Sequence, residues 1–141
     1  LRVRCIDRSV IAVFASRDYV ARHGAPKSPR QTKGHAALIP GGELAALPEG
    51  RWLSAQPSVA VVFTSNSLPA LVAAARAGRG LIALSASWGA REPNLVRLFD
   101  VPKIPARAMW LVSTEASAKR PASVVVMRHL LEMIGRPAKR A

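Results

Sequence analysis

The chain has 141 residues, half of them hydrophobic, and a net charge of +13 from 21 Lys and Arg against 8 Asp and Glu. This hydrophobic content is enough to bury a core, which excludes a disordered chain. The single cysteine, Cys5, has no internal partner, so a disulfide-stabilised fold is also excluded and a reducing compartment is indicated.

The excess positive charge favours polyanionic partners such as nucleic acid. The basic residues are dispersed along the chain, however, and no basic helix, zinc finger or aromatic RNA-binding motif organises them. Charge alone supplies only non-specific affinity, so we interpret it mainly as a solvated, arginine-rich surface. A basic module that binds nucleic acid without sequence preference is kept as an alternative prediction.

Residues 52–75 carry no charge and are long enough to raise the question of a membrane span. Ser, Thr, Asn, Gln and Pro residues fall throughout this segment, and a helix there would place their hydrogen-bonding groups in hydrocarbon. The first residues also lack the charged, apolar and small-residue regions of a signal peptide. We therefore predict a cytoplasmic protein without membrane contact.

The first third of the chain predicts a strand, a short helix and loops. Residues 9–15 are typical of a strand, and Ser16 is positioned to cap a short helix that ends at Gly24. Two segments rich in Gly, Pro and polar residues, 27–35 and 40–50, are predicted to be connections with a helical turn possible in each.

A strand, a helix and a second strand are predicted next. Residues 59–63 form an apolar, β-branched run typical of a strand buried on both faces. The helix that follows ends near Gly78, and residues 81–84 form another buried strand. The apolar residues of the helix recur at helical spacing: Leu68, Leu71, Val72 and Ala75. Because the crossover is short, residues 59–84 predict a β-α-β unit with parallel strands.

The last third predicts an edge strand at 95–99, a further strand at 109–113 and a helix at 121–134. The final six residues, 136–141, are basic and small, which predicts a frayed tail.

Hydroxyl and amide side chains lie where the strand at 59–63 ends and the next helix begins. They are Thr64, Ser65, Asn66 and Ser67, with Ser67 or its neighbour as the helix cap. A helix start offers unpaired amides and the positive end of the macrodipole, and α/β sheets bind ligands at the carboxyl ends of their strands. The pattern therefore predicts a site for a small anion, with an ordinary capped turn as the plain alternative.

Several kinds of chemistry find no support in the sequence. The three histidines are scattered, without a second metal-ligating residue at a usable spacing. Gly78-Arg79-Gly80 follows a helix and lacks the third glycine of a dinucleotide-binding motif. No nucleophile elbow, phosphate loop or carboxylate pair is present. We predict no metal, no cofactor and no catalytic residues, so the chain is not expected to be an enzyme.

Short motifs follow one another over nearly the whole chain. They are Ala-Ser-Arg-Asp-Tyr-Val-Ala-Arg-His-Gly-Ala-Pro at 15–26 with Ser28-Pro29, Gly34-His35, Trp52, Asn66-Ser67-Leu68 through Gly80, Pro93 to Leu98, Trp110-Leu111-Val112 and the final amphipathic helix. In their order and spacing, the chain resembles the effector-binding domain of LysR-type transcriptional regulators.

This resemblance implies two α/β lobes like those of type 2 periplasmic binding proteins, with a small inducer in the cleft. Residues 1–135 would form part of that domain. Residues 9–105 would be the second lobe, with a mainly parallel sheet flanked by helices, and residues 106–135 the strand and helix that return to an incomplete first lobe. The helix-turn-helix domain that binds DNA would lie outside this chain.

The resemblance also implies a function and a site. Thr64, Ser65 and Asn66 match the second-lobe turn that bonds inducer carboxylates or sulfates, and Ser16, at the end of the first strand, is a further candidate. We expect an anion-sensing module that forms homo-oligomers and transmits effector binding to DNA-binding domains. A solute-binding protein of a transport system shares this architecture and is the other alternative.

Overall fold

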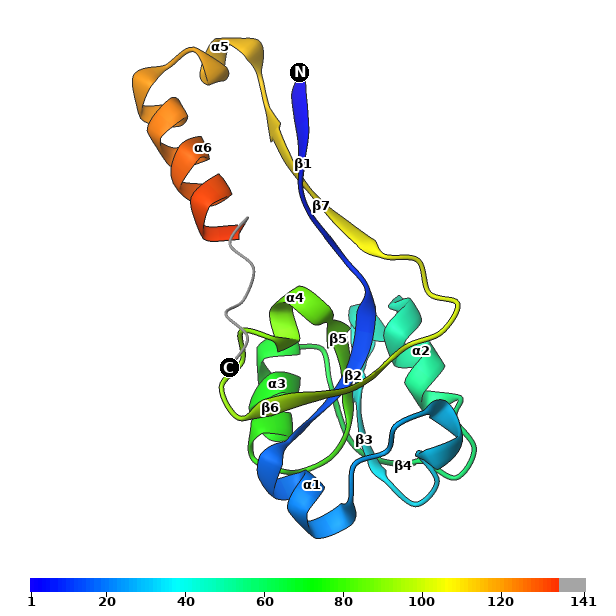
Figure 1. Cartoon of the computed structure of the whole chain (residues 1–141). Coiled ribbons are helices and arrows are strands. Elements are labelled where there is room, and N and C mark those ends of the chain that lie inside the picture. The colour runs from blue at the N-terminus through cyan, green and yellow to red at the C-terminus, as the bar shows by residue number, and fades with distance from the viewer. Residues whose placement is uncertain (135–141) are drawn as a thin grey trace. The chain divides into compact units, whose positions relative to one another are not determined.

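The computed structural model describes residues 1–134 and divides the chain into two compact units (Figure 1). One unit comprises Leu1–Ser9 together with the chain from Ala106 onward, and the other is Val10–Pro105. The predicted tail at 136–141 lies outside the described residues. Within residues 1–134, no helix is long and apolar enough to cross a membrane.

The larger unit is built around strand β2 (Ile11–Ser16), which pairs with β5 (Ile82–Ser85) on one side and β6 (Leu95–Asp100) on the other, both antiparallel. Strands β3 (Ala36–Pro40) and β4 (Ala60–Ser65) form a separate parallel pair. A parallel bridge between Ala37 and Leu81 joins β3 to the chain just before β5.

The prediction of a mainly parallel sheet was wrong, because β2 runs against both of its neighbours. The crossover rule constrains only the strands that flank a helix, here β4 and β5, and both run parallel to β3. It does not constrain β2, which is joined to β3 by a helix and a long loop. The sheet is therefore mixed, within the α/β class that was predicted.

The β2 run is apolar because both of its faces are covered. Ile11, Val13 and Ala15 contribute to one hydrophobic cluster, and Ala12 and Phe14 to a second. The first cluster includes Leu53 from α2 (Pro48–Ser54), and the second includes residues of α3 (Leu68–Arg76) and Ala86 of the short α4 (Ala86–Gly89). Helices thus cover the central strand from both sides.

Two predicted helix starts are confirmed. The Ser16 hydroxyl accepts a hydrogen bond from the Tyr19 amide at 3.1 Å and caps α1 (Arg17–His23). The Ser67 hydroxyl accepts one from the Ala70 amide at 3.4 Å and caps α3. The two predicted connections hold short 3-10 turns at Pro29–Gln31 and Gly42–Ala46, but the structure adds β3 and α2, which the sequence analysis did not identify.

The prediction that residues 59–63 are buried on both faces was wrong. Val61, Val62 and Phe63 are 51%, 54% and 41% exposed. Among the described strands, β4 pairs with β3 alone and so lies at an edge. A β-branched run is a signal for a strand, and it does not say whether another element covers that strand.

The smaller unit contains β1 (Arg2–Ser9) paired antiparallel with β7 (Arg107–Ser113), then α5 (Glu115–Ala118) and α6 (Pro121–Ile134). The bounds of α6 match the predicted helix, yet none of its residues is buried. Among its residues up to Ile134, the unit has no fully buried apolar side chain. Its most exposed large apolar side chains are Leu1, Val3, Met109, Trp110, Val112, Val125, Val126 and Met133.

Candidate functional site

The turn between β4 and α3 is shaped by its own hydroxyl groups. The Ser65 hydroxyl accepts a hydrogen bond from the Ser67 amide at 3.1 Å, and the Ser67 hydroxyl accepts from the Ala70 amide. A serine hydroxyl accepts and donates at once, so each of these groups keeps its hydrogen to donate to a ligand. Both residues are half-buried, which fixes their positions beside the start of α3.

The two other predicted site residues, Thr64 and Asn66, are exposed. In the described part of the chain, their side chains make no hydrogen bond. A hydroxyl and an amide are therefore available next to the two serines. The structure brings these four polar side chains to one helix start.

A second segment lies against this turn. The Gly41 amide donates to the Ser65 carbonyl at 2.8 Å, and a Cβ added at Gly41 would overlap the Thr64 methyl group. Gly42 has φ +57, and a Cβ there would come within 3.1 Å of the Asn66 Cβ. Only glycine combines this backbone conformation with such a close approach. The loop after β3 is thus held against the turn after β4.

Ser85 is a polar residue at the same edge that the sequence analysis did not select. It is the last residue of β5, which runs parallel to β3 and β4, and its side chain makes no capping bond to α4. Strand β3 lies between the chain entering β5 and β4, so Ser85 and Ser65 end parallel strands on either side of it. The place of Ser85 at the end of a predicted buried strand was the signal that could have identified it.

Ser16 lies at the opposite edge. Strand β2 runs antiparallel to β5, so its carboxyl end points away from Ser85 and the Thr64–Ser67 turn. The Ser16 hydroxyl is fully buried as the cap of α1 and lies near Gly78, beyond the far end of α3. Nine helical residues separate these ends by about 13 Å. The structure does not bring Ser16 together with the other predicted residues.

The turn combines a helix dipole with an absence of nearby acidic residues in the sequence. The positive end of the α3 macrodipole faces it, and residues 60–75 contain no acidic side chain. Within residues 1–134, no three His, Cys, Asp or Glu side chains come together in a way that could hold a metal ion. The site therefore offers hydrogen-bond donors and a dipole.

A family model described as the LysR substrate binding domain matches residues 1–135. The chain belongs to this family. No curated protein matches it. Among solved structures, the chain is similar to the regulatory domain of CrgA, a LysR-type transcriptional regulator from Neisseria meningitidis, with 25% identity and a TM-score of 0.66. The match covers 95% of this chain and 69% of that domain.

Two further structures place the LysR substrate-binding fold in context. A longer structure of CrgA is 25% identical with a TM-score of 0.65, and the match covers 96% of this chain and 48% of that one. The regulatory domain of Synechocystis PCC6803 CcmR, solved in complex with 2-PG, is 16% identical with a TM-score of 0.59, and the match covers 94% and 66%. The chain therefore spans about half of the longer CrgA structure.

Proposed function

We propose that this chain is the effector-sensing part of a LysR-type transcriptional regulator, and that the Thr64–Ser67 turn binds the anionic group of the effector. The family match over residues 1–135 is the observation that carries the proposal. The donors at the α3 start support the anionic class of ligand. This is a binding function, and no catalytic step is assigned to the chain.

The effector would act by changing the balance between two arrangements of the regulator. A ligand shifts such a balance only by as much as it prefers one arrangement. We assign DNA binding to a helix-turn-helix domain outside the chain, and the match over only 48% of the longer CrgA structure leaves room for such a domain. Calorimetric titration of the full-length regulator with small carboxylates and sulfate tests the proposal. Binding of neutral analogues alone would contradict the anionic class.

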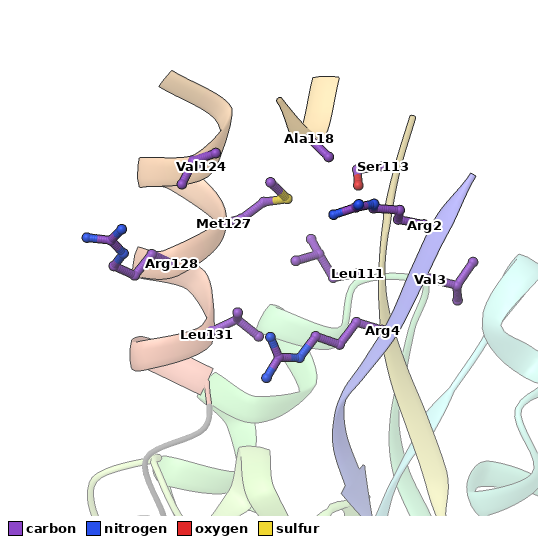
Figure 2. A pocket seen from close by; sticks show the side chains of 10 residues that line it. All are labelled: Arg2, Val3, Arg4, Leu111, Ser113, Ala118, Val124, Met127, Arg128 and Leu131. Atoms are coloured by element: carbon purple, nitrogen blue, oxygen red, sulfur yellow. The ribbon is translucent and has the colours of Figure 1, made fainter. Parts of the chain in front are cut away.

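We assign the larger unit to the second lobe of the effector domain and the smaller unit to the first lobe. A groove of about 690 Å³ between α6 and the β1–β7 pair supports this assignment. Figure 2 shows Leu111, Met127 and Leu131 pointing into the groove beside the Arg2 and Arg4 side chains. A two-stranded pair is marginally stable unless it packs against another element, and no residue of α6 is buried here. The remaining third of a CrgA-like domain would cover these faces.

The chain expressed alone should therefore self-associate. Light scattering after size-exclusion chromatography should give a mass well above the 15.1 kDa of one chain, rising with concentration. Changing Trp110 and Val112, which share a face of β7, to Lys should reduce that mass. Changing the exposed Ala21 and Ala25 to Lys adds the same charge elsewhere on the chain. This control should leave the mass unchanged. A monodisperse monomer would contradict the lobe assignment.

The exposed β4 face supports the proposal that the regulator forms homo-oligomers through this domain. Val62 and Phe63 border an open groove of about 670 Å³ that Ala73, Ala77 and Arg79 also line. An apolar edge strand of this kind is a liability unless another chain covers it.

Val62→Glu should weaken self-association of the full-length regulator by about tenfold, since a buried carboxylate at an apolar contact costs 1.4 kcal/mol or more. Because Val62 is more than half exposed in the chain, the variant should fold normally. Sedimentation equilibrium would measure the dissociation constant, with Ala21→Glu as a charge-matched control. An unchanged constant would remove β4 from the interface.

A further inference from the structure

A cluster of titratable groups lies at the edge opposite the Thr64–Ser67 turn. Tyr19 is 2% exposed, and its hydroxyl oxygen is 3.0 Å from both the Ala36 amide and His35 Nδ1. The His23 ring packs against the Tyr19 ring with centroids 4.6 Å apart, and the His35 ring lies at 5.8 Å. Tyr19 thus links helix α1 to the start of β3.

The hydrogen-bond donors fix where the proton on His35 must lie. The Ala36 amide donates to the Tyr19 oxygen, so the hydroxyl hydrogen is left for His35 Nδ1. That bond requires Nδ1 to be unprotonated, with the ring hydrogen on Nε2. If Nδ1 carried a proton instead, the buried hydroxyl hydrogen would have no acceptor among the described residues. The arrangement therefore depends on a neutral His35.

This linkage also holds the strands on either side of β3. The carbonyl of His35 accepts from the Ala60 amide, the first residue of β4, at 3.0 Å. The Ala36 carbonyl accepts from the Leu81 amide, just before β5, at 2.8 Å. The Tyr19–His35–Ala36 linkage thus stands at the point where β3 begins to pair with both neighbours.

The surroundings of the cluster are positive. Helix α1 brings His23 and Arg22, and the Arg22 guanidinium donates to the Gly78 carbonyl at 3.0 Å. From β3, the Ala36 amide faces the cluster and donates to the Tyr19 oxygen. Neither histidine forms an ion pair with an acidic side chain among residues 1–134. Burial, and then the charge of His23, lower the pKa of His35. Burial raises the pKa of Tyr19.

We propose that the Tyr19–His35–Ala36 linkage is a proton-sensitive latch: protonation of His35 at Nδ1 removes the acceptor of the Tyr19 hydroxyl hydrogen and loosens the start of the β3–β4 pair. The proposal stands apart from the effector site and does not depend on it. It gives the domain a response to mild acidification that adds to its response to a ligand.

The sign of the pH dependence follows from the lowered pKa of His35. The folded chain binds the proton less well than the unfolded chain, whose histidine has a pKa near 6.5. The stabilising contribution is therefore fully present above about pH 6.5 and is lost as the pH falls through the folded pKa.

Histidine C2-hydrogen exchange followed by mass spectrometry tests the latch in the full chain, because it reports the pKa of each histidine even in a self-associating sample. Tyr19→Phe removes the hydroxyl that stabilises neutral His35. His35 should then gain about threefold to tenfold in proton affinity, the worth of one hydrogen bond. His23→Gln should shift the pKa of His35 in the same direction without touching the bond. An unchanged His35 pKa in Tyr19→Phe overturns the proposal, whatever His23→Gln does.

Amide hydrogen exchange supplies the structural readout. Protection of the peptide spanning residues 34–40, corrected for intrinsic exchange, should fall between pH 7.5 and 5.5 in the unmodified chain. In His35→Asn, whose side-chain oxygen takes the position of Nδ1 and accepts from Tyr19 without titrating, it should stay constant. His129→Gln, a histidine change in the smaller unit, should behave like the unmodified chain. Equal pH dependence in all three proteins overturns the latch.

Discussion

Ser65→Asp should lower the affinity of the regulator for an anionic effector by about thirtyfold or more. The Asp carboxylate can still accept from the Ser67 amide, so the turn should keep its shape. A fixed negative charge about 4 Å from the ligand costs roughly 4 kcal/mol at an effective dielectric constant of 20. Halving that for solvent access leaves about 2 kcal/mol, or roughly thirtyfold. Calorimetric titration would measure the change.

Ser65→Asn is the matched control, since it has the same shape and acceptor as Asp without the charge. It should bind much more nearly like the unmodified protein. Similar losses of affinity in both variants would show that the size of the new side chain, and not its charge, weakens effector binding.

Thr64→Val tests a single donor at the same turn. The methyl that faces Gly41 is kept while the hydroxyl is lost, so the packing should survive. Affinity should fall by about 1.5 to 3 kcal/mol if the lost bond was to a charged group. Unchanged binding in Ser65→Asp and Thr64→Val, with intact folding, would leave the turn as an ordinary helix cap.

The largest effect on stability is expected at Gly89, the last residue of α4. An added Cβ would overlap the ring of Phe14, which is fully buried in the centre of β2. Neither side can yield easily, because the ring is enclosed by the core and the glycine belongs to a short helix. Gly89→Ala should cost about 3 kcal/mol, the upper end of overpacking effects, in urea unfolding of the regulator.

A double variant separates overpacking from a helix effect. Phe14→Leu removes the ring, so Gly89→Ala should cost much less in that background. If the two changes are additive, the steric explanation is wrong. Alanine has a higher helix propensity than glycine. A loss of stability in Gly89→Ala would therefore come from the contact with Phe14 and not from the helix itself.

The sequence predicted local structure best where a side chain signals it directly. Ser16 and Ser67 marked two helix starts through their hydroxyls, and the apolar spacing of residues 121–134 marked α6. Strand β3 was missed because the five-residue segment Ala36–Pro40 is short, ends in proline and carries little periodicity. Strand β1 was missed because its alternating charges belong to a strand without a buried face.

Long-range relations were harder to predict. The direction of β2 depends on pairing with β5 and β6, about 70 and 80 residues further along the chain, and no local signal encodes it. For the same reason Ser16 and Ser65, both at strand ends, were assigned to one site although their strands end at opposite edges. The turn at 64–67 was predicted because its residues are contiguous, whereas the glycines that pack against it come from another segment.

The division into two units also has a consequence for synthesis on the ribosome. The larger unit is one continuous stretch, so all of it is made before the partner strand of β1 exists. Strand β1 must wait while about 100 further residues are added, which takes roughly 5 to 20 s at about 5 to 20 residues per second. During that interval the edge of β1 that pairs with β7 lacks this partner and is open to other chains. Its arginines, repeated every second residue at its start, would keep such a nascent strand from pairing with a copy of itself.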